Sequence, residues 1–369
     1  MEFLFFLLLN LFQVVESANP FRCRHAVEST GGWWGATTVD DELEKFIMVL
    51  FGPKLFEAYM AAAVPRLSML SAWESYKKTF KSVTSTPFDC RLEFLEDQEV
   101  DLKNVVGTFS DHSFGPVADL AARTYVIKIP VSFVKSFFRV PLEKIVKHLL
   151  VQTARVVEAK QPFVEFILLA GGFSESPYLQ EVIGDAFASQ VIISHNAGSL
   201  IQTGAVMYGL TPETITSRIM RCTFGYRVAE KFATFRFLNG TISIADKNTF
   251  DHKETGDKYI TRFIKFVEKG ETVSFSDEIS HSISPLYDSQ RECTIDIYYT
   301  AKTTVPIFVD EPLVKKIGTF VVDMGVHGEN KSPSRHAFLT FRFGLTSLEV
   351  TAVAALTGEE FIIELVLPK

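Results

Sequence analysis

Residues 163–180 constrain the fold of this chain more than any other stretch, because they combine a strand, a glycine pair and a helix start. Residues 163–169 are mostly apolar and have the length and composition of a buried strand. Gly171 and Gly172 end this strand, and a helix is expected to begin near Pro177. Backbone N–H groups and the positive end of the helix then meet where no Cβ is in the way. A polar or anionic ligand can approach such a turn closely.

Two further glycine-rich segments extend this pattern. Residues 191–193 form a second short apolar run, and a polar loop then leads into a helix whose Gly204 and Ala205 are expected to allow close packing. A third cluster, residues 29–40, precedes a helical pattern. Three such turns on an α/β frame predict a cleft that holds, or once held, a nucleotide.

The remaining chain divides into a mixed half and a β-rich half. Helices are predicted over residues 39–60, over 66–83 and from Pro141 onward, with strands of a small subdomain in 86–129. After about residue 216, short runs of β-branched and aromatic residues predict an all-β second domain. We therefore expect an α/β plus all-β protein. Its predicted parts are a hydrophobic segment 1–18, an α/β domain 19–212 and a β domain 213–369.

Composition narrows the range of partners. The chain has 369 residues, of which 47% are apolar and 22% charged, as is usual for a globular protein. Its formal net charge of −7 argues against nucleic acid as a partner. The four cysteines are far apart, and neither they nor the histidines have the spacing of a metal site. Isolated thiols are favoured, and a disulfide pair is left open. The 34 phenylalanines indicate a rich core and an apolar surface groove.

The first 18 residues are strongly apolar but too short to span a bilayer, so no membrane span is expected. Three interpretations stay open: a signal peptide in residues 1–17, a buried strand, or a spurious start in place of a lost N-terminal half. Glu2 and the absence of Lys or Arg before the apolar run do not favour a signal peptide. A cytoplasmic location is therefore expected, with secretion as the alternative.

Four short motifs follow one another in a specific order. They are Gly31-Gly32 with Val39-Asp40, then Glu74-x-x-Lys77-Lys78, then Ala170-Gly-Gly-Phe-Ser-Glu-Ser-Pro177, and then Gly198 with Gly204-Ala-Val206. In this order they resemble the second lobe of the actin-like, ribonuclease H-like ATPase domain of the 70-kDa heat-shock proteins. The third motif is most similar to the atypical branch called heat shock 70 kDa protein 12.

The resemblance continues to the end of the chain and covers roughly residues 25–369. Residues 295–299, 317–323 and 343–357 look like strands of the family's β-sandwich peptide-binding domain. The resemblance thus implies a partial actin-like ATPase lobe followed by a β-sandwich, peptide-binding-like domain without the usual helical lid. It also implies chaperone-like or scaffold behaviour in the stress response, with a polypeptide client or signalling protein as partner. The family's first lobe would precede Gly31.

The resemblance implies an adenine-nucleotide site for ATP or ADP with Mg. In the family, the glycines that match Gly31 and Gly32 approach the terminal phosphates. The helix that matches Glu74, Lys77 and Lys78 grips ribose and adenine. Taken alone, a Glu–Lys spacing also fits solvated charges on a helix, and that alternative stays open.

The remaining assigned residues are Gly171, Gly172 and Glu175. The two glycines match the loop on the adenosine side. Glu175 stands where ordinary members have an arginine that stacks on adenine, and a carboxylate cannot make that cation–π contact. The family takes most of its catalytic groups from the first lobe, so no catalytic residue is assigned and ATP hydrolysis is not expected. Nucleotide binding is expected to be vestigial.

Two alternatives to a nucleotide-linked function follow from the residues. One is a polypeptide-binding module that works without nucleotide. The other is an α/β-hydrolase, since residues 172–176 partly mimic a nucleophile elbow with Ser174 as nucleophile and His195 downstream. The elbow lacks its final glycine and an oxyanion motif, so the sequence favours the hydrolase least.

Overall fold

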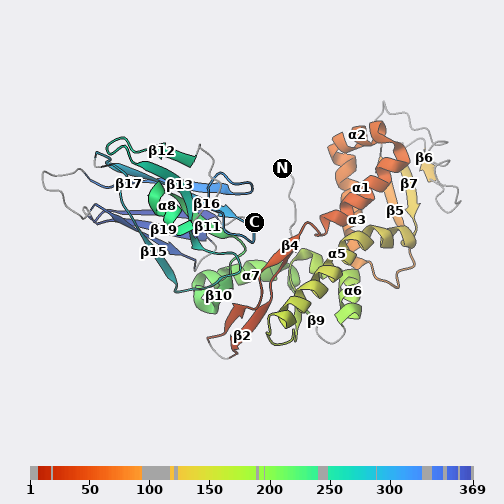
Figure 1. The fold of residues 1–369 in the computed structure, drawn as a ribbon. Coiled ribbons are helices and arrows are strands. Elements are labelled where there is room, and N and C mark those ends of the chain that lie inside the picture. The colour runs from red at the N-terminus through yellow and green to blue at the C-terminus, as the bar shows by residue number, and fades with distance from the viewer. Residues whose placement is uncertain are drawn as a thin grey trace. The chain divides into compact units, whose positions relative to one another are not determined.

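A computed structural model describes residues 7–17, 20–93, 117–119, 124–187, 191–194, 196–239, 248–287, 289–325, 335–343, 347–355 and 358–366. The chain forms two compact units (Figure 1). The first comprises Met1–Leu9 and Thr30–Val206, and the second comprises Asn10–Ser29 and Met207–Lys369. Each unit has its own hydrophobic core.

The first unit mixes helices with short strands. Its helices are α1 (Thr37–Phe51), α2 (Pro53–Ala61), α3 (Ala63–Thr79), α5 (Val131–Glu158), the short 3-10 helix η2 (Gly172–Glu175), α6 (Pro177–Phe187) and the start of α7 (Ala197–Leu210). Its strands are β1 (Leu7–Leu9), β4 (Thr30–Gly32), β5 (Phe88–Glu93), β6 (Val117–Asp119), β7 (Thr124–Ile129), β8 (Ile167–Leu169) and β9 (Val191–Ile193).

Aromatic packing holds the helices of this unit together. Trp73 of α3 is 1% exposed, and its ring lies against Phe88 and Phe137 at centroid distances of 5.1 and 6.1 Å. Phe138 of α5 stacks on Phe80 at 5.5 Å. Large rings bury much apolar area, so these contacts account for much of the packing among α3, α5 and β5. The expected phenylalanine-rich core is confirmed.

Helix boundaries differ from the sequence prediction in three places. The helix predicted over 66–83 is α3, which begins at Ala63 and ends at Thr79. The single helix predicted over 39–60 is two helices, because Gly52 adopts φ +75° and Pro53 starts α2. The helix predicted from Pro141 begins ten residues earlier, at Val131, and contains Pro141. The sequence pattern misled here because proline usually marks a helix start, whereas Pro141 is buried inside α5.

The strand predicted over 163–169 is also shorter than expected. Only Ile167–Leu169 form β8, which pairs in parallel with β9, as the apolar run 191–193 had indicated. Ile167 is buried, whereas Phe163 and Leu168 are 84% and 62% exposed. The seven-residue run is therefore not a buried strand, because only alternate side chains of β8 face the core. Gly204 and Ala205 of α7 do not provide close packing either, since α7 is mostly exposed.

The second unit is built mainly from strands. They are β2 (Phe12–Glu16), β3 (Arg22–His25), β10 (Ile215–Ile219), β11 (Thr223–Lys231), β12 (Thr249–Asp251), β13 (Lys258–Val267), β14 (Thr272–Ser274), β15 (Glu278–Ile283), β16 (Glu292–Thr300), β17 (Lys315–Asp323), β18 (Ala337–Arg342), β19 (Ser347–Ala354) and β20 (Glu360–Val366). A short 3-10 helix, η4 (Pro212–Thr214), precedes β10.

Two antiparallel sheets of this unit share one core. Their strand orders are β12-β13-β11-β16-β17 and β15-β18-β19-β20. Phe266 of the first sheet stacks on Phe341 of the second with ring centroids 3.7 Å apart. The region predicted to be all-β also contains a helix, α8 (Phe232–Asn239). Phe235 of α8 is fully buried against Phe308, and this contact holds the helix against the rest of the unit.

Three further predictions concern the N-terminal segment, the cysteines and a possible membrane span. Strand β2 carries mostly exposed side chains, so residues 12–16 are not a buried strand. All four cysteines are free thiols, and three of them, Cys23, Cys90 and Cys293, are buried. Within the described ranges, no helix combines the length and hydropathy needed to cross a bilayer.

Candidate functional site

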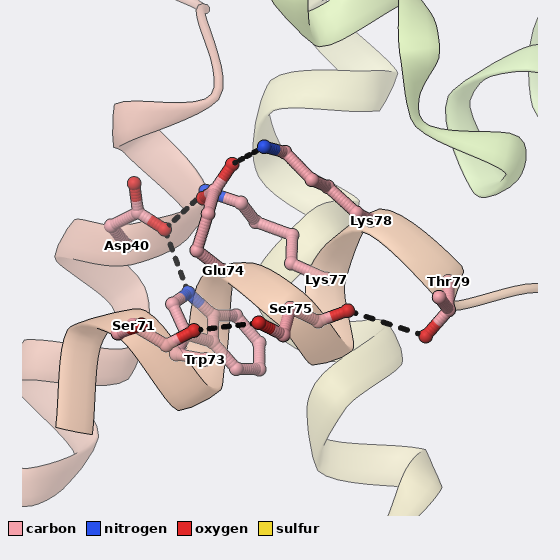
Figure 2. A network of polar contacts seen from close by, with 8 residues as sticks. All are labelled: Asp40, Ser71, Trp73, Glu74, Ser75, Lys77, Lys78 and Thr79. Carbon is pink, nitrogen blue, oxygen red and sulfur yellow. Dashed lines mark hydrogen bonds and ion pairs between the residues drawn. The ribbon is translucent and has the colours of Figure 1, made fainter. Parts of the chain in front are cut away.

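Helices α1 and α3 are joined by a compact polar network (Figure 2). Asp40 of α1 accepts hydrogen bonds from Lys77 Nζ and Trp73 Nε1, each at 2.7 Å. Lys77 Nζ also lies 2.6 Å from Glu74 Oε2, and Lys78 Nζ lies 3.4 Å from Glu74 Oε1. The spacing of three and four residues places Glu74 beside both lysines on one face of α3.

The members of this network differ in burial. The side chain of Lys77 is only 5% exposed, whereas those of Glu74 and Lys78 are 46% and 60% exposed. A buried ammonium group needs charge compensation, and Asp40 and Glu74 supply it. Lys77 is therefore not the solvated helix charge that the sequence left open as an alternative. Lys78 fits that description better.

The lysines also determine how Glu74 titrates. Partial burial, the largest single influence, raises the pKa of the Glu74 carboxyl group. The hydrogen bonds and positive charges of Lys77 and Lys78 together outweigh it, so the pKa lies below its ordinary value of 4.5. Glu74 is ionised at neutral pH and remains paired with both lysines.

The glycine pair before α6 forms a tight turn with open space in front of it. Gly171 has φ +92° and ψ 169°, a conformation that essentially only glycine adopts. A Cβ placed on Gly171 or Gly172 would meet no atom within 4 Å. The backbone N–H of Gly171 donates to the carbonyl oxygen of Ala197 at 2.8 Å. The turn is thus tied to the start of α7.

Glu175 also links the turn to the start of α7. Its Oε1 atom accepts a hydrogen bond of 2.9 Å from the backbone N–H of Gly198, in the first turn of α7. A Cβ on Gly198 would lie 2.6 Å from this oxygen, so a larger residue there would require the Glu175 carboxylate to shift. Carboxylates stabilise helix N-termini, which explains the arrangement. The sequence analysis missed this contact. The glycine in the first turn of the predicted helix was its only signal.

The serines of this turn have distinct functions. Ser176 Oγ accepts from the Leu179 N–H at 3.4 Å, so Ser176 caps α6. Ser174 is 4% exposed, and its hydroxyl donates to the Gly171 carbonyl at 2.5 Å. A nucleophile elbow presents an exposed hydroxyl, so this geometry does not favour the hydrolase. His195 lies outside the described residues.

Gly31 and Gly32 lie in a strand rather than in a turn. Strand β4 pairs antiparallel with β1, with Gly31 opposite Leu8 and Gly32 opposite Leu7. A Cβ on Gly32 would lie 2.5 Å from the indole ring of Trp34. The space beside Gly32, where the resemblance implies a phosphate, is therefore occupied by the Trp34 side chain.

The two parts of the predicted site are linked through the segment after α3. The Phe80 ring meets that of Tyr178 on α6 at 5.2 Å, and the Ser82 N–H donates to Glu181 Oε2 at 2.7 Å. These contacts hold the end of α3 beside the helix that follows the glycine turn. Among described residues, no hydrogen bond or ion pair joins the Glu74–Lys77–Lys78 group directly to that turn. The described ranges also contain no cluster of three acidic, His or Cys side chains placed to hold a metal.

Comparison with known proteins gives a consistent set of relatives. The chain is 26% identical to heat shock 70 kDa protein 12A of Mus musculus and to the same protein of Homo sapiens. It is 24% identical to human heat shock 70 kDa protein 12B. Each match extends over 346 residues and covers 90% of this chain. No family model matches the sequence.

The chain spans about half the length of these curated relatives, since the matches cover 48% of each. The mixed α/β architecture, with its several sheets, is compatible with the actin-like ATPase-type fold that the resemblance implies. The similarity extends over 90% of the chain. The chain is therefore homologous to heat shock 70 kDa proteins 12A and 12B, and so to the atypical protein 12 branch of the 70-kDa heat-shock proteins.

Proposed function

We propose that this chain acts as an atypical heat-shock-70-like polypeptide-binding protein, chaperone-like or scaffold, in which nucleotide binding is vestigial. The observation that carries the proposal is the pairing of Lys77. Its ammonium group is buried between Asp40 and Glu74, at 2.7 and 2.6 Å. Two carboxylate partners already neutralise the charge of this lysine, so it attracts a nucleotide only weakly. Separating it from them costs free energy.

Glu175 supports the same conclusion from the other part of the predicted site. It contributes a negative charge where the family's arginine would stack on adenine. It also accepts a hydrogen bond from the Gly198 N–H, which occupies a donor at the start of α7. A nucleotide carries several negative charges, so a fixed carboxylate opposes its approach. The open space before Gly171 and Gly172 favours the approach of a ligand.

The second unit supplies the polypeptide-binding part of the proposal. We interpret its two facing sheets as the β-sandwich that the resemblance implies. Strand β20 lies at the end of its sheet, and Ile362 and Val366 on it are 63% and 78% exposed. An outer strand with exposed apolar side chains can pair with an extended apolar peptide through backbone hydrogen bonds. We place peptide capture at this edge.

The test uses the full chain and two titrations. The first is calorimetric titration with Mg-ATP and Mg-ADP, in which no saturable heat is expected up to millimolar nucleotide. The second follows the fluorescence anisotropy of a labelled, extended apolar peptide. Binding is expected, with a Kd that Mg-ATP does not change.

Matched variants make the outcome decisive. Ile362→Glu, on the edge strand, should weaken peptide binding. Phe338→Glu places the same charge at an exposed apolar site on β18, which is paired on both sides, and should not. Micromolar nucleotide binding that is lost in Lys78→Ala but kept in Lys45→Ala would overturn the vestigial assignment. Failure to bind any apolar peptide would overturn the polypeptide assignment.

A further inference from the structure

An apolar groove runs between α5 and α6, which lie side by side in the first unit (Figure 1). It has a volume of about 640 Å³, within the range of small-molecule sites. Leu142, Val146 and Leu150 of α5 and Val182 of α6 provide the apolar lining. These α5 residues recur every four positions, so they form one continuous stripe along the helix.

The groove is long enough for an extended chain molecule. Its lining on α5 extends from Ser132 to Leu150, which corresponds to roughly 27 Å of helix. An extended hydrocarbon chain can therefore lie along this apolar lining.

One wall of the groove is fixed before any ligand arrives. Tyr178 of α6 packs edge-to-face against Phe80 at 5.2 Å and against Phe138 at 5.3 Å. Two perpendicular ring contacts hold the tyrosine ring in place. This wall therefore keeps its shape when a ligand binds, so little conformational entropy is lost there on binding.

Charge along the rim selects the head group. The charged lining residues are Lys135, Arg139, Glu143 and Lys147, so cations outnumber the single carboxylate. Lys135 donates to the Ser82 carbonyl, whereas Arg139 has no hydrogen bond or ion pair with any described residue. A planar guanidinium group binds carboxylates in a bidentate manner. Arg139 stands beside the start of the Leu142–Val146–Leu150 stripe, where the head of a ligand lying on that stripe would be.

From these features we propose that the groove between α5 and α6 binds a free long-chain carboxylate. Its alkyl chain lies on Leu142, Val146 and Leu150, and its carboxylate pairs with Arg139. The long side chain of Lys147 can cover the alkyl chain with its methylene groups while its ammonium group stays in water. This site is separate from the glycine turn and from the Asp40–Lys77 network.

The proposal is tested by calorimetric titration of the full chain with dodecanoate below its micellar concentration, and with dodecanol as the neutral match. Dodecanoate should bind saturably and more tightly than dodecanol. Arg139→Glu should weaken dodecanoate binding about tenfold and remove its advantage over dodecanol. Leu150→Asp should weaken both ligands. Each methylene added to the chain should raise affinity up to about fourfold while the groove has room.

Controls come from the same helix. Lys144→Glu reverses a charge on an exposed α5 residue outside the groove lining, and matches Arg139→Glu. Val151→Asp introduces a charge at an exposed apolar residue outside the lining, and matches Leu150→Asp. Both should bind dodecanoate as the wild type does. The positions changed in the variants and controls are all exposed: Arg139, Lys144, Leu150 and Val151. The altered proteins are therefore expected to fold, and circular dichroism checks this. Absence of saturable binding, equal losses in the control variants, or binding only to phosphatidylserine vesicles or an acidic helical peptide would overturn the proposal.

Discussion

Asp40 makes the contacts that join α1 to α3 at the polar network. Its Oδ1 atom accepts hydrogen bonds from both Trp73 and the buried Lys77. Asp40→Asn keeps an oxygen acceptor of similar shape but removes the negative charge, which leaves the Lys77 ammonium with Glu74 alone. We expect the free energy of unfolding to fall by about 2 kcal/mol, because a buried charge loses a partner.

Urea denaturation of the full chain measures this change. The control is Glu42→Gln, on the same helix, whose pair with Lys45 is at the surface. An exposed pair of this kind contributes little, so a loss of no more than about 0.5 kcal/mol is expected there. Equal effects in the two variants would mean that the burial of Lys77 adds nothing to stability.

At the level of elements, the turn between β8 and α6 gives a sharp test. Gly171 has a positive φ and Gly172 does not, yet both have open space where a Cβ would lie. Gly171→Ala should therefore destabilise by about 1–3 kcal/mol through backbone strain alone. Gly172→Ala should be neutral or stabilise by up to about 1 kcal/mol, since it restricts the unfolded chain. Thermal unfolding of both variants checks the difference, and equal losses would contradict the strain argument.

The elements show how far local pattern predicts structure. The strand at 191–193 and the β-rich region after about residue 216 follow from short-range residue preferences, and the structure confirms them. The errors occurred where tertiary packing prevailed. Pro141 suggested a helix start, but burial keeps it inside α5. The run 163–169 looked like a buried strand, although only Ile167 of it is buried.

The candidate site was predictable only in part for a related reason. The Glu74–Lys77–Lys78 group follows from helical spacing, because its members are close in sequence. The partners Asp40 and Gly198 lie far from Lys77 and Glu175 in sequence, and only the folded chain brings them together. Without those partners, the sequence could not distinguish a lysine available to a ligand from one that is already paired.

At the scale of the whole molecule, the two units should unfold separately because each has its own core. Cys90 reports on the first unit and Cys293 on the second, and both thiols are buried. Burial raises the pKa of the Cys90 thiol to about 12, so it should not react while its unit is folded. Cys222, which is only partly buried, should react first.

Thiol labelling at increasing urea, followed by peptide mass spectrometry, tests this expectation. Protection of Cys90 and Cys293 should be lost at different urea concentrations. Labelling of both at a single midpoint would show that the chain unfolds as one cooperative unit.

The exposed segment before and within β8 has a consequence for the polypeptide binding that we propose. Phe163, Phe166 and Leu168 are 84%, 57% and 62% exposed, so the folded chain displays an apolar segment of the kind that chaperones recognise in unfolded proteins. Under that proposal, each copy would both bind apolar segments and display one. At high concentration, one copy would compete with genuine clients for the edge strand of another, and the apparent capacity for clients would fall as the protein accumulates.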